Sequence, residues 1–287
     1  MFFWDRTWAL TRMTFDVIKK YNEMLLFPLL AAISSVLFSL AMLFPTVITE
    51  LLHAGRLEWQ PLQIAVTFAT YFGLAIITTF FNTCVVYTTR VRLSGGDATF
   101  GQSVSFAFSR FGRILSWSLL AATVGLLLSM LENAARKGKG AGAILLLMLR
   151  GMLSIAWNVV TLFVVPAMVY RDLGPIDAIK SSMDTLRSTW GESLVRHYGM
   201  GLATFVFALP GIVGAMVILF ALSSGLSVGL GVAMLGVVGL YLLCVALVFN
   251  VANAVFNTAL YHYATTQQTP AGFSPEVLQS VFAQSRP

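Results

Sequence analysis

The chain has 287 residues, of which 57% are hydrophobic and only 10% are charged, and its mean hydropathy is +0.82. Soluble domains carry about 25% charged residues, so this composition excludes an ordinary water-soluble enzyme. The two cysteines exclude a disulfide scaffold and a multi-cysteine metal cluster, and the formal charge of +6 is better interpreted loop by loop than as a sign of nucleic-acid binding.

Long runs without Asp, Glu, Lys or Arg bound the membrane spans. These runs hold 26 residues after Glu23, 31 after Glu58, 18 after Arg113 and 20 after Arg150. A spanning helix needs about 20 apolar residues, because the hydrocarbon layer is about 30 Å thick, so each run holds one helix. The sequence predicts an all-α polytopic membrane fold with six spans, near residues 24–48, 62–89, 114–131, 147–170, 197–222 and 227–264.

The last two of these spans share one uncharged run of 79 residues, from His197 to Pro275. That length accommodates two long helices or three short ones. The turn signal inside the run is Ser223-Ser224-Gly225, and a polar stretch over 265–270 closes it. We therefore expect two helices, followed by a polar tail over 266–287.

The distribution of Lys and Arg between the loops predicts the orientation. With the N-terminus inside, the inner segments carry 13 of the 18 basic residues and the outer segments carry 5, as the positive-inside rule requires. The second outer loop, with Arg136, Lys137 and Lys139, runs against the rule. We expect both termini in the cytoplasm and, because no cleavable signal is apparent at the start, a place in the plasma membrane of a prokaryote.

Three stretches on the predicted inner side precede the odd-numbered spans, and each places apolar and polar residues on opposite faces of a helix. We expect them to form amphipathic helices at the cytoplasmic membrane surface. Their apolar faces hold Trp4, Trp8, Phe15 and Ile18 in the first, Phe100, Val104, Phe108 and Phe111 in the second, and Ile176, Ile179, Met183, Leu186 and Trp190 in the third. The polar face of the third holds Asp177, Lys180, Ser181, Asp184 and Arg187.

These stretches belong to a pattern of internal similarity. A shift of 79 residues superposes Arg92 on Arg171 and Ser103 on Ser182, and a shift of 175 superposes residues 81–83 on 256–258. We interpret the chain as one membrane domain of three units, approximately 1–90, 97–170 and 175–265, each an interfacial helix followed by a helical hairpin. The alternative is the similarity that any membrane boundary imposes on a sequence.

Two segments carry a resemblance to known sequences. The run VVPAMVY from Val164, followed by LGPIDAIKSS from Leu173, resembles a pattern in the membrane region of glycerophosphoryl diester phosphodiesterases. The opening, with WAL from Trp8 and EMLLFP from Glu23, looks like the start of a six-span prokaryotic family of unknown function. The chain has no room for the phosphodiesterase's separate catalytic barrel, so the resemblance implies a fold and no reaction.

Polar side chains inside the spans are candidates for function, because an unpaired polar group in hydrocarbon is costly. The asparagines of the sixth span recur at spacings of three and four, which puts them on one helix face. Together with the second and fourth spans they form a predicted seam of Thr79, Asn82, Asn158, Asn250, Asn253 and Asn257. The seam suits a passage for a neutral solute or lipid, and the alternative is hydrogen bonding between helices.

Aromatic rings on one helix face and basic residues on the other suit contact with anionic headgroups. The candidate lipid-contact residues are Trp4, Trp8, Arg12, Phe108, Arg110, Arg113, Lys180, Arg187 and Trp190. Simple anchoring to the membrane surface is the alternative. Arg150, inside the fourth span, is expected to extend toward the outer headgroups.

We expect no catalytic residue, metal or cofactor. The three histidines have no carboxylate at ligand spacing, and neither cysteine has a charged neighbour that would activate a thiolate. The function favoured by the sequence is therefore that of a non-enzymatic membrane-organising accessory protein that binds lipids or partners. The expected partners are the bilayer and its anionic headgroups, with a second copy or another membrane protein left open and no nucleic acid. A transporter or channel using the polar seam is the alternative function.

Overall fold

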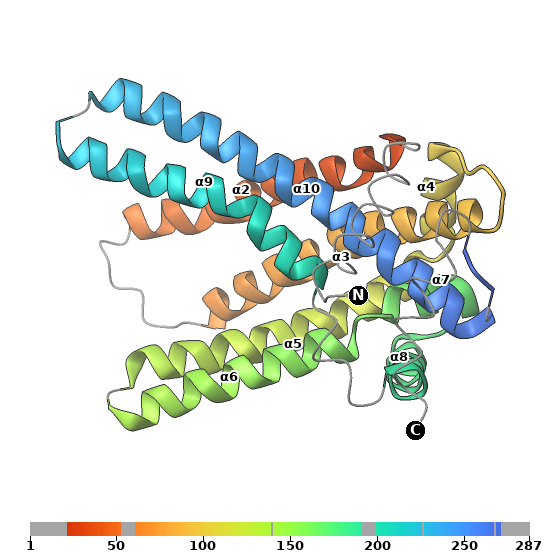
Figure 1. Ribbon diagram of the computed structural model, residues 1–287. Helices are drawn as coiled ribbons and strands as arrows, with labels where there is room; N and C mark the ends of the chain where they lie inside the picture. The colour runs from red at the N-terminus through yellow and green to blue at the C-terminus, as the bar shows by residue number, and fades with distance from the viewer. Residues whose placement is uncertain are drawn as a thin grey trace. The chain divides into compact units, whose positions relative to one another are not determined.

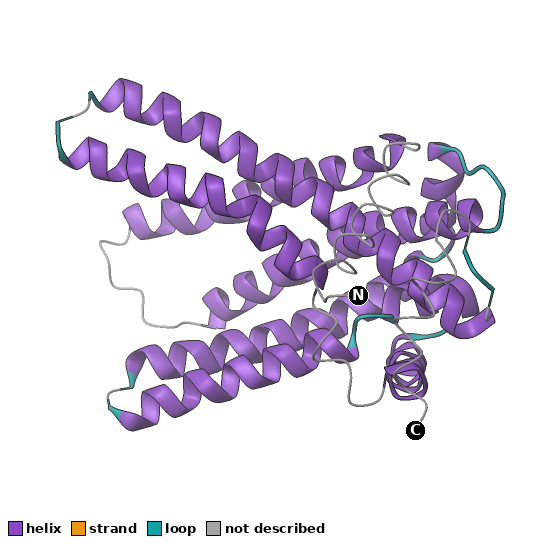
Figure 2. Cartoon of the chain, in the orientation of Figure 1, coloured by secondary structure: helices purple, strands orange, loops and turns teal. Residues whose placement is uncertain are grey.

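The structure is a computed structural model that describes residues 22–52, 61–138, 140–190, 199–225, 227–266 and 268–270. Figure 2 shows this described part of the chain as helices joined by loops, with no strand in it. The helices, labelled in Figure 1, are η1 (Asn22–Leu25), α2 (Leu26–Leu52), α3 (Pro61–Leu93), α4 (Phe100–Ser109), α5 (Phe111–Lys137), α6 (Ala141–Val160), α7 (Val164–Arg171), α8 (Pro175–Trp190), α9 (Gly199–Ser223) and α10 (Val228–Thr266).

Six of the helical segments in the described residues are long and apolar enough to cross a membrane. They cover residues 23–44, 64–93, 111–137, 142–171, 204–223 and 228–266. A helix satisfies every backbone hydrogen bond internally, which hydrocarbon demands of a spanning segment. The predicted all-α fold with six spans is confirmed, and the protein is a multi-pass membrane protein.

The chain forms two compact units, each described here by itself. Unit 1 comprises Met1–Leu26 and Ser188–Pro287, and unit 2 comprises Phe27–Arg187. In unit 2, α3 packs against α4, α5 and α7, and α5 packs against α6. The long helices of this unit alternate in direction, so α4, α7 and α8 lie at one end of them and the α5–α6 turn lies at the other (Figure 1).

Two local signals shape the short helices of unit 2. Helix α4 begins with a capping box, in which the Thr99 hydroxyl accepts from the Gln102 amide and the Gln102 side chain accepts from the Thr99 amide. The fourth span breaks at residues 161–163, before α7. Pro166 explains the position of this break, because proline has no N–H for the carbonyl four residues earlier and its ring clashes there.

Unit 1 contains a helical hairpin of α9 and α10. The turn lies at the predicted Ser223-Ser224-Gly225, where the amide of Ser224 donates to the carbonyl of Phe220 and Gly225 adopts φ +105°, which favours glycine. Two helices, and not three, therefore occupy the long uncharged run. Helix α10 has 39 residues and is about 58 Å long at 1.5 Å per residue.

The first amphipathic stretch and most of the polar tail lie outside the described residues. The second stretch corresponds to α4 and the third to α8. The threefold repeat and the interfacial position of these helices remain predictions.

Candidate functional site

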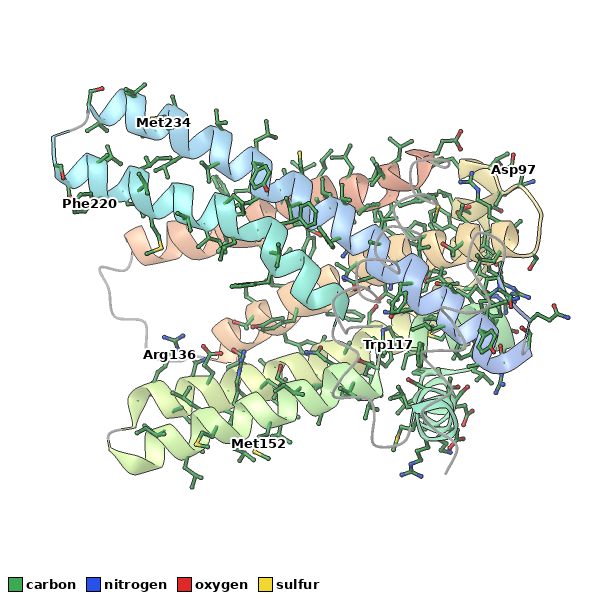
Figure 3. All side chains as sticks on the ribbon, in the orientation of Figure 1. Asp97, Trp117, Arg136, Met152, Phe220 and Met234 are labelled. Atoms are coloured by element: carbon green, nitrogen blue, oxygen red, sulfur yellow. The ribbon has the colours of Figure 1, made fainter. Side chains whose placement is uncertain are left out.

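Five arginines gather at the end of unit 2 where α4, α7 and α8 lie. We call this set the arginine cluster, and it consists of Arg90, Arg92, Arg110, Arg113 and Arg171. Among the described residues, Asp97 pairs with Arg92, and Asp172 pairs with Arg110 and Arg113. Figure 3 shows Asp97 in the loop before α4 and Arg136 at the opposite end of the unit, near the α5–α6 turn.

At the centre of the cluster, one carboxylate is shared by two guanidinium groups. Asp172 pairs with both Arg110 and Arg113, which flank the start of α5. The side chain of Arg110 is 30% exposed, that of Arg113 is 35% exposed and that of Asp172 is 46% exposed, so the group is accessible from outside the unit. This contact ties the turn after α7 to the junction of α4 and α5.

The backbone of Asp172 is unusual. It ends α7 in the left-handed conformation, with φ 57° and ψ 37°, and it has the one positive φ among the described non-glycine residues. Asp and Asn tolerate this region better than most residues, at some cost. In this turn before Gly174-Pro175, its carboxylate contacts Arg110 and Arg113 at the start of α5.

A second arginine holds α7 against α3. The guanidinium of Arg90 donates to the carbonyl of Val169 at 2.7 Å and lies 4.8 Å from the ring centre of Tyr170. The Tyr170 ring packs against a buried cluster that consists of Val86, Val165 and Val169. Because a carbonyl and a ring supply no formal negative charge, these contacts leave the charge of Arg90 without neutralisation.

Arginine and aromatic side chains alternate across this cluster. Phe106 stacks on Tyr87 with ring centres 4.2 Å apart, and the guanidinium of Arg110 lies 5.4 Å from the centre of the Phe106 ring. Arg92 is buried and contacts the carboxylate of Asp97 and the carbonyl of Ala98, each at 3.5 Å. The arginines are therefore held in place by the rings and carbonyls around them.

Helix α8 presents three faces, where the sequence predicted two. Its buried face is made of small residues, and there the amide of Phe163 donates to the hydroxyl of Ser182 at 3.2 Å. This face holds Ala178, Ser181, Ser182, Thr185 and Leu186. Ser181, expected on the polar face, is buried because its size allows close packing. The expected apolar face is only partly open: Leu186 is buried, Ile179 and Met183 are half-buried, and Ile176 is 62% exposed.

Helix α4 repeats this arrangement. Ser103 and Ala107 form its buried face, and the Ser103 hydroxyl hydrogen-bonds the Thr88 hydroxyl at 2.6 Å. The neighbouring face exposes Phe100 and Phe108, although Phe100 stacks on Phe27 at 5.0 Å and Phe108 meets Phe80 edge-on at 4.9 Å. In both helices, an apolar face stays partly open and a polar face stays open, while a third face packs on the unit.

A comparison with known families adds one match. A family described as "Family of unknown function (DUF6159)" matches residues 62–273. The chain belongs to this family. No curated protein matches the sequence.

The DUF6159 match covers the arginine cluster, α8 and the α9–α10 hairpin. It confirms the expected assignment to a family of unknown function. Nothing in it connects the chain to the phosphodiesterases that the sequence resembles.

The candidate lipid-contact residues of this DUF6159 chain have different surroundings. Arg110 and Arg113 come together on Asp172, whereas Lys180 lies 3.6 Å from Asp177 on the exposed side of α8 and Arg187 is exposed. Trp4, Trp8 and Arg12 lie outside the described residues, as does the side chain of Trp190. Their predicted contact with lipid remains a prediction.

The predicted polar seam is divided between the units. Thr79, Asn82 and Asn158 belong to unit 2, with Thr79 buried and Asn158 exposed. Asn250, Asn253 and Asn257 belong to unit 1, where Asn250 is exposed and the other two are half-buried. Threonines beside the seam donate to carbonyls of their own helices, Thr83 to Thr79 and Thr161 to Trp157, both at 2.8 Å. The seam remains a prediction.

A second ionic group lies near the other end of unit 2. Glu132 of α5 accepts from Arg136 at 2.7 Å and pairs with Arg150 of α6 at 3.2 Å. Arg150, expected to extend toward headgroups, therefore has a carboxylate partner within its own hairpin.

Sequence reasoning missed Asp172, Arg90 and Glu132 as partners of other charges. The partners of Asp172 lie about 60 positions earlier in the chain, and those of Arg90 lie 79 positions later. The signal that could have identified Asp172 is an acidic residue in the turn before Gly174-Pro175, next to an otherwise basic segment.

Proposed function

We propose that this DUF6159 protein is a non-enzymatic membrane-organising protein that binds anionic lipid through the arginine cluster and the open faces of α4 and α8. The single observation that carries the proposal is the three-faced arrangement of α8. One face packs on the protein, a second holds the exposed Ile176 beside the half-buried Ile179 and Met183, and a third exposes charged residues of both signs, among them Lys180 and Arg187. A helix at a membrane surface needs this combination, because its apolar face enters the acyl boundary while its basic residues meet headgroups.

The arginine cluster supports the same proposal. Five arginines face two acidic residues at one end of unit 2, and basic clusters beside spanning helices attract anionic lipid. The exposed Phe108 ring on α4 lies two residues from Arg110. An aromatic side chain and a guanidinium at one level suit the boundary between acyl chains and headgroups.

We propose further that this end faces the cytoplasm and that both termini lie there, in the plasma membrane of a prokaryote. The alternating helices of unit 2 support this orientation, because they carry the arginine cluster to one end (Figure 1). The basic residues near the α5–α6 turn count against it, although Glu132 offsets part of their charge. Cysteine labelling from each side of the membrane would test the orientation.

The resemblance to the phosphodiesterase membrane region is carried forward as a proposal of shared fold. The residues that carry it form the helix break before Pro166 and the start of α8 at Pro175. We propose that the phosphodiesterase membrane region has the same break and the same following helix. A structure of that region with an unbroken helix at the corresponding prolines would refute this.

The test of function is lipid retention in a mild detergent. We expect the purified protein to retain anionic lipid, enriched relative to the membrane of origin, when bound lipid is extracted and quantified. Replacing Lys180 and Arg187 with Gln should lower this enrichment, while Arg136→Gln, at the other end of unit 2, should leave it unchanged. Recovery of a folded, lipid-free protein with an enzymatic activity would refute the proposal. So would a solute flux in liposomes that is lost when Asn82, Asn253 and Asn257 become Leu.

A further inference from the structure

We propose that Arg110 and Arg113 form a binding site for a phosphate-bearing anion, and that Asp172 occupies this site until the anion displaces it. The inference rests on the proposed function, because it names the ligand chemistry of the arginine cluster. It goes beyond that function because it identifies the carboxylate of Asp172 as a competitor of the anion within the protein.

The first step of the argument is that the site already holds an oxyanion. The carboxylate of Asp172 contacts the guanidinium groups of both Arg110 and Arg113. Guanidinium groups bind phosphate and carboxylate oxygens with the same geometry. A lipid phosphodiester offers two unesterified oxygens and one negative charge, as a carboxylate does, so it can take the place of Asp172 on both guanidinium groups.

The second step concerns charge. Two guanidinium groups against one carboxylate leave one positive charge in excess. Arg90, which contacts a carbonyl and a ring, adds to it.

The third step concerns access and release. All three side chains are about a third to a half exposed, so an outside ligand reaches them without opening the core. Asp172 lies in an exposed turn and in a left-handed conformation that disfavours it relative to glycine. Rotation of its side chain away from Arg110 and Arg113 would leave both guanidinium groups open to a ligand.

The fourth step places the ligand. Phe108 is 62% exposed and Phe111 is 41% exposed, and both flank Arg110 in the sequence. If these rings enter the acyl boundary, the guanidinium groups lie at headgroup depth. A lipid phosphate is therefore the ligand source that the site fits, and free phosphate is the alternative that shares its chemistry.

The experiment measures binding of phosphatidylglycerol by native mass spectrometry, with the full chain in neutral detergent and phosphatidylcholine as the matched lipid. Replacing Arg113 with Gln should weaken phosphatidylglycerol binding about tenfold, the value of one charged hydrogen bond. Asp172→Asn should strengthen binding, because Asn keeps the left-handed turn and removes the competing charge. Arg136→Gln should change nothing.

Asp172→Gly is the second variant, since glycine accepts the same backbone conformation and also removes the carboxylate. Unchanged or weaker phosphatidylglycerol binding by both folded Asp172 variants overturns the inference. Inorganic phosphate is added in a separate arm. Phosphate that binds the Asp172 variants without lipid assigns the site to free phosphate, and phosphate that only competes with bound lipid assigns it to the headgroup.

The two proposals fail differently. If the wild-type protein and every variant bind phosphatidylglycerol no better than phosphatidylcholine, the proposed function fails. If phosphatidylglycerol binds preferentially but responds to Lys180→Gln and not to changes at Arg113 or Asp172, only the present inference fails.

Discussion

The hydroxyl of Tyr241 in α10 donates a hydrogen bond to the backbone carbonyl of Phe207 in α9, at 2.6 Å. Pro210 follows within the same helix, and it has no N–H for the carbonyl of the preceding turn. Gly211 lies against Leu242 and Tyr241 so closely that an added Cβ would come within 2.6 Å of Leu242. The carbonyl that loses its backbone donor is that of Val206, four residues before Pro210, so the Tyr241 bond to Phe207 is a separate link between α10 and α9 beside the proline.

This relationship gives the first prediction. Tyr241→Phe removes the donor and should destabilise the α9–α10 hairpin by about 1 kcal/mol, the scale of polar contacts between membrane helices. Unfolding by SDS titration in detergent measures the change. A Tyr241→Phe variant as stable as the wild type would show that this bond contributes nothing to the hairpin.

The second prediction concerns the Thr88–Ser103 hydrogen bond, which joins α3 to α4 in a fully buried position. Thr88→Val and Ser103→Ala should each destabilise unit 2 by about 1–3 kcal/mol, because each leaves a buried hydroxyl without this partner. The double variant should cost little more than either single one. Thermal unfolding followed by circular dichroism measures this coupling, and strictly additive losses would contradict it.

The third prediction concerns the Glu132–Arg150 ion pair in the α5–α6 hairpin. Glu132→Gln leaves Arg150 inside a membrane span without its ion-pair partner and should destabilise the hairpin, whereas Arg150→Gln leaves Glu132 paired with Arg136 and should cost less. The double variant should be more stable than the less stable of the two single variants. SDS titration of the three variants checks the order. A double variant weaker than both single ones would rule out mutual neutralisation.

The fourth prediction concerns Arg90, which holds α7 by a hydrogen bond to Val169 and a contact with the Tyr170 ring. Arg90→Gln should destabilise unit 2 by about 2 kcal/mol, since it removes a charged hydrogen bond and a cation–π contact. Arg90→Lys keeps the charge but not the planar group, so it should recover part of the loss. Thermal stability in detergent reports both, with Arg136→Gln as the control.

The membrane fold was predictable because hydrocarbon imposes one rule on the whole chain. Charged residues are costly inside a span and gather near its ends, so the long gaps between them indicate the spans, and the Ser223-Ser224-Gly225 signal marks the last turn. The helix ends were less accurate. The third span was expected over 114–131, but α5 covers 111–137, because charged residues such as Glu132 and Arg136 continue the helix through an ion pair.

The faces of the short helices were harder to predict than their existence. Periodicity separates apolar from polar residues, but it assigns Ser181 by polarity alone. In α8, close packing selects small side chains, so Ser181 and Ser182 are buried and Ile176 is exposed. A pairing such as Asp172 with Arg113 joins residues about 60 positions apart, and no local pattern in one sequence encodes it.

The length of α10 has a mechanical consequence. At about 58 Å it is nearly twice the thickness of the hydrocarbon layer, which is about 30 Å. Leu230, Val237 and Leu243 are exposed in its first half, whereas Phe249, Val255 and Tyr261 are buried in its second half. One continuous helix therefore joins an exposed apolar segment to a buried one. A thinner bilayer would tilt this helix, and its buried half would move with it.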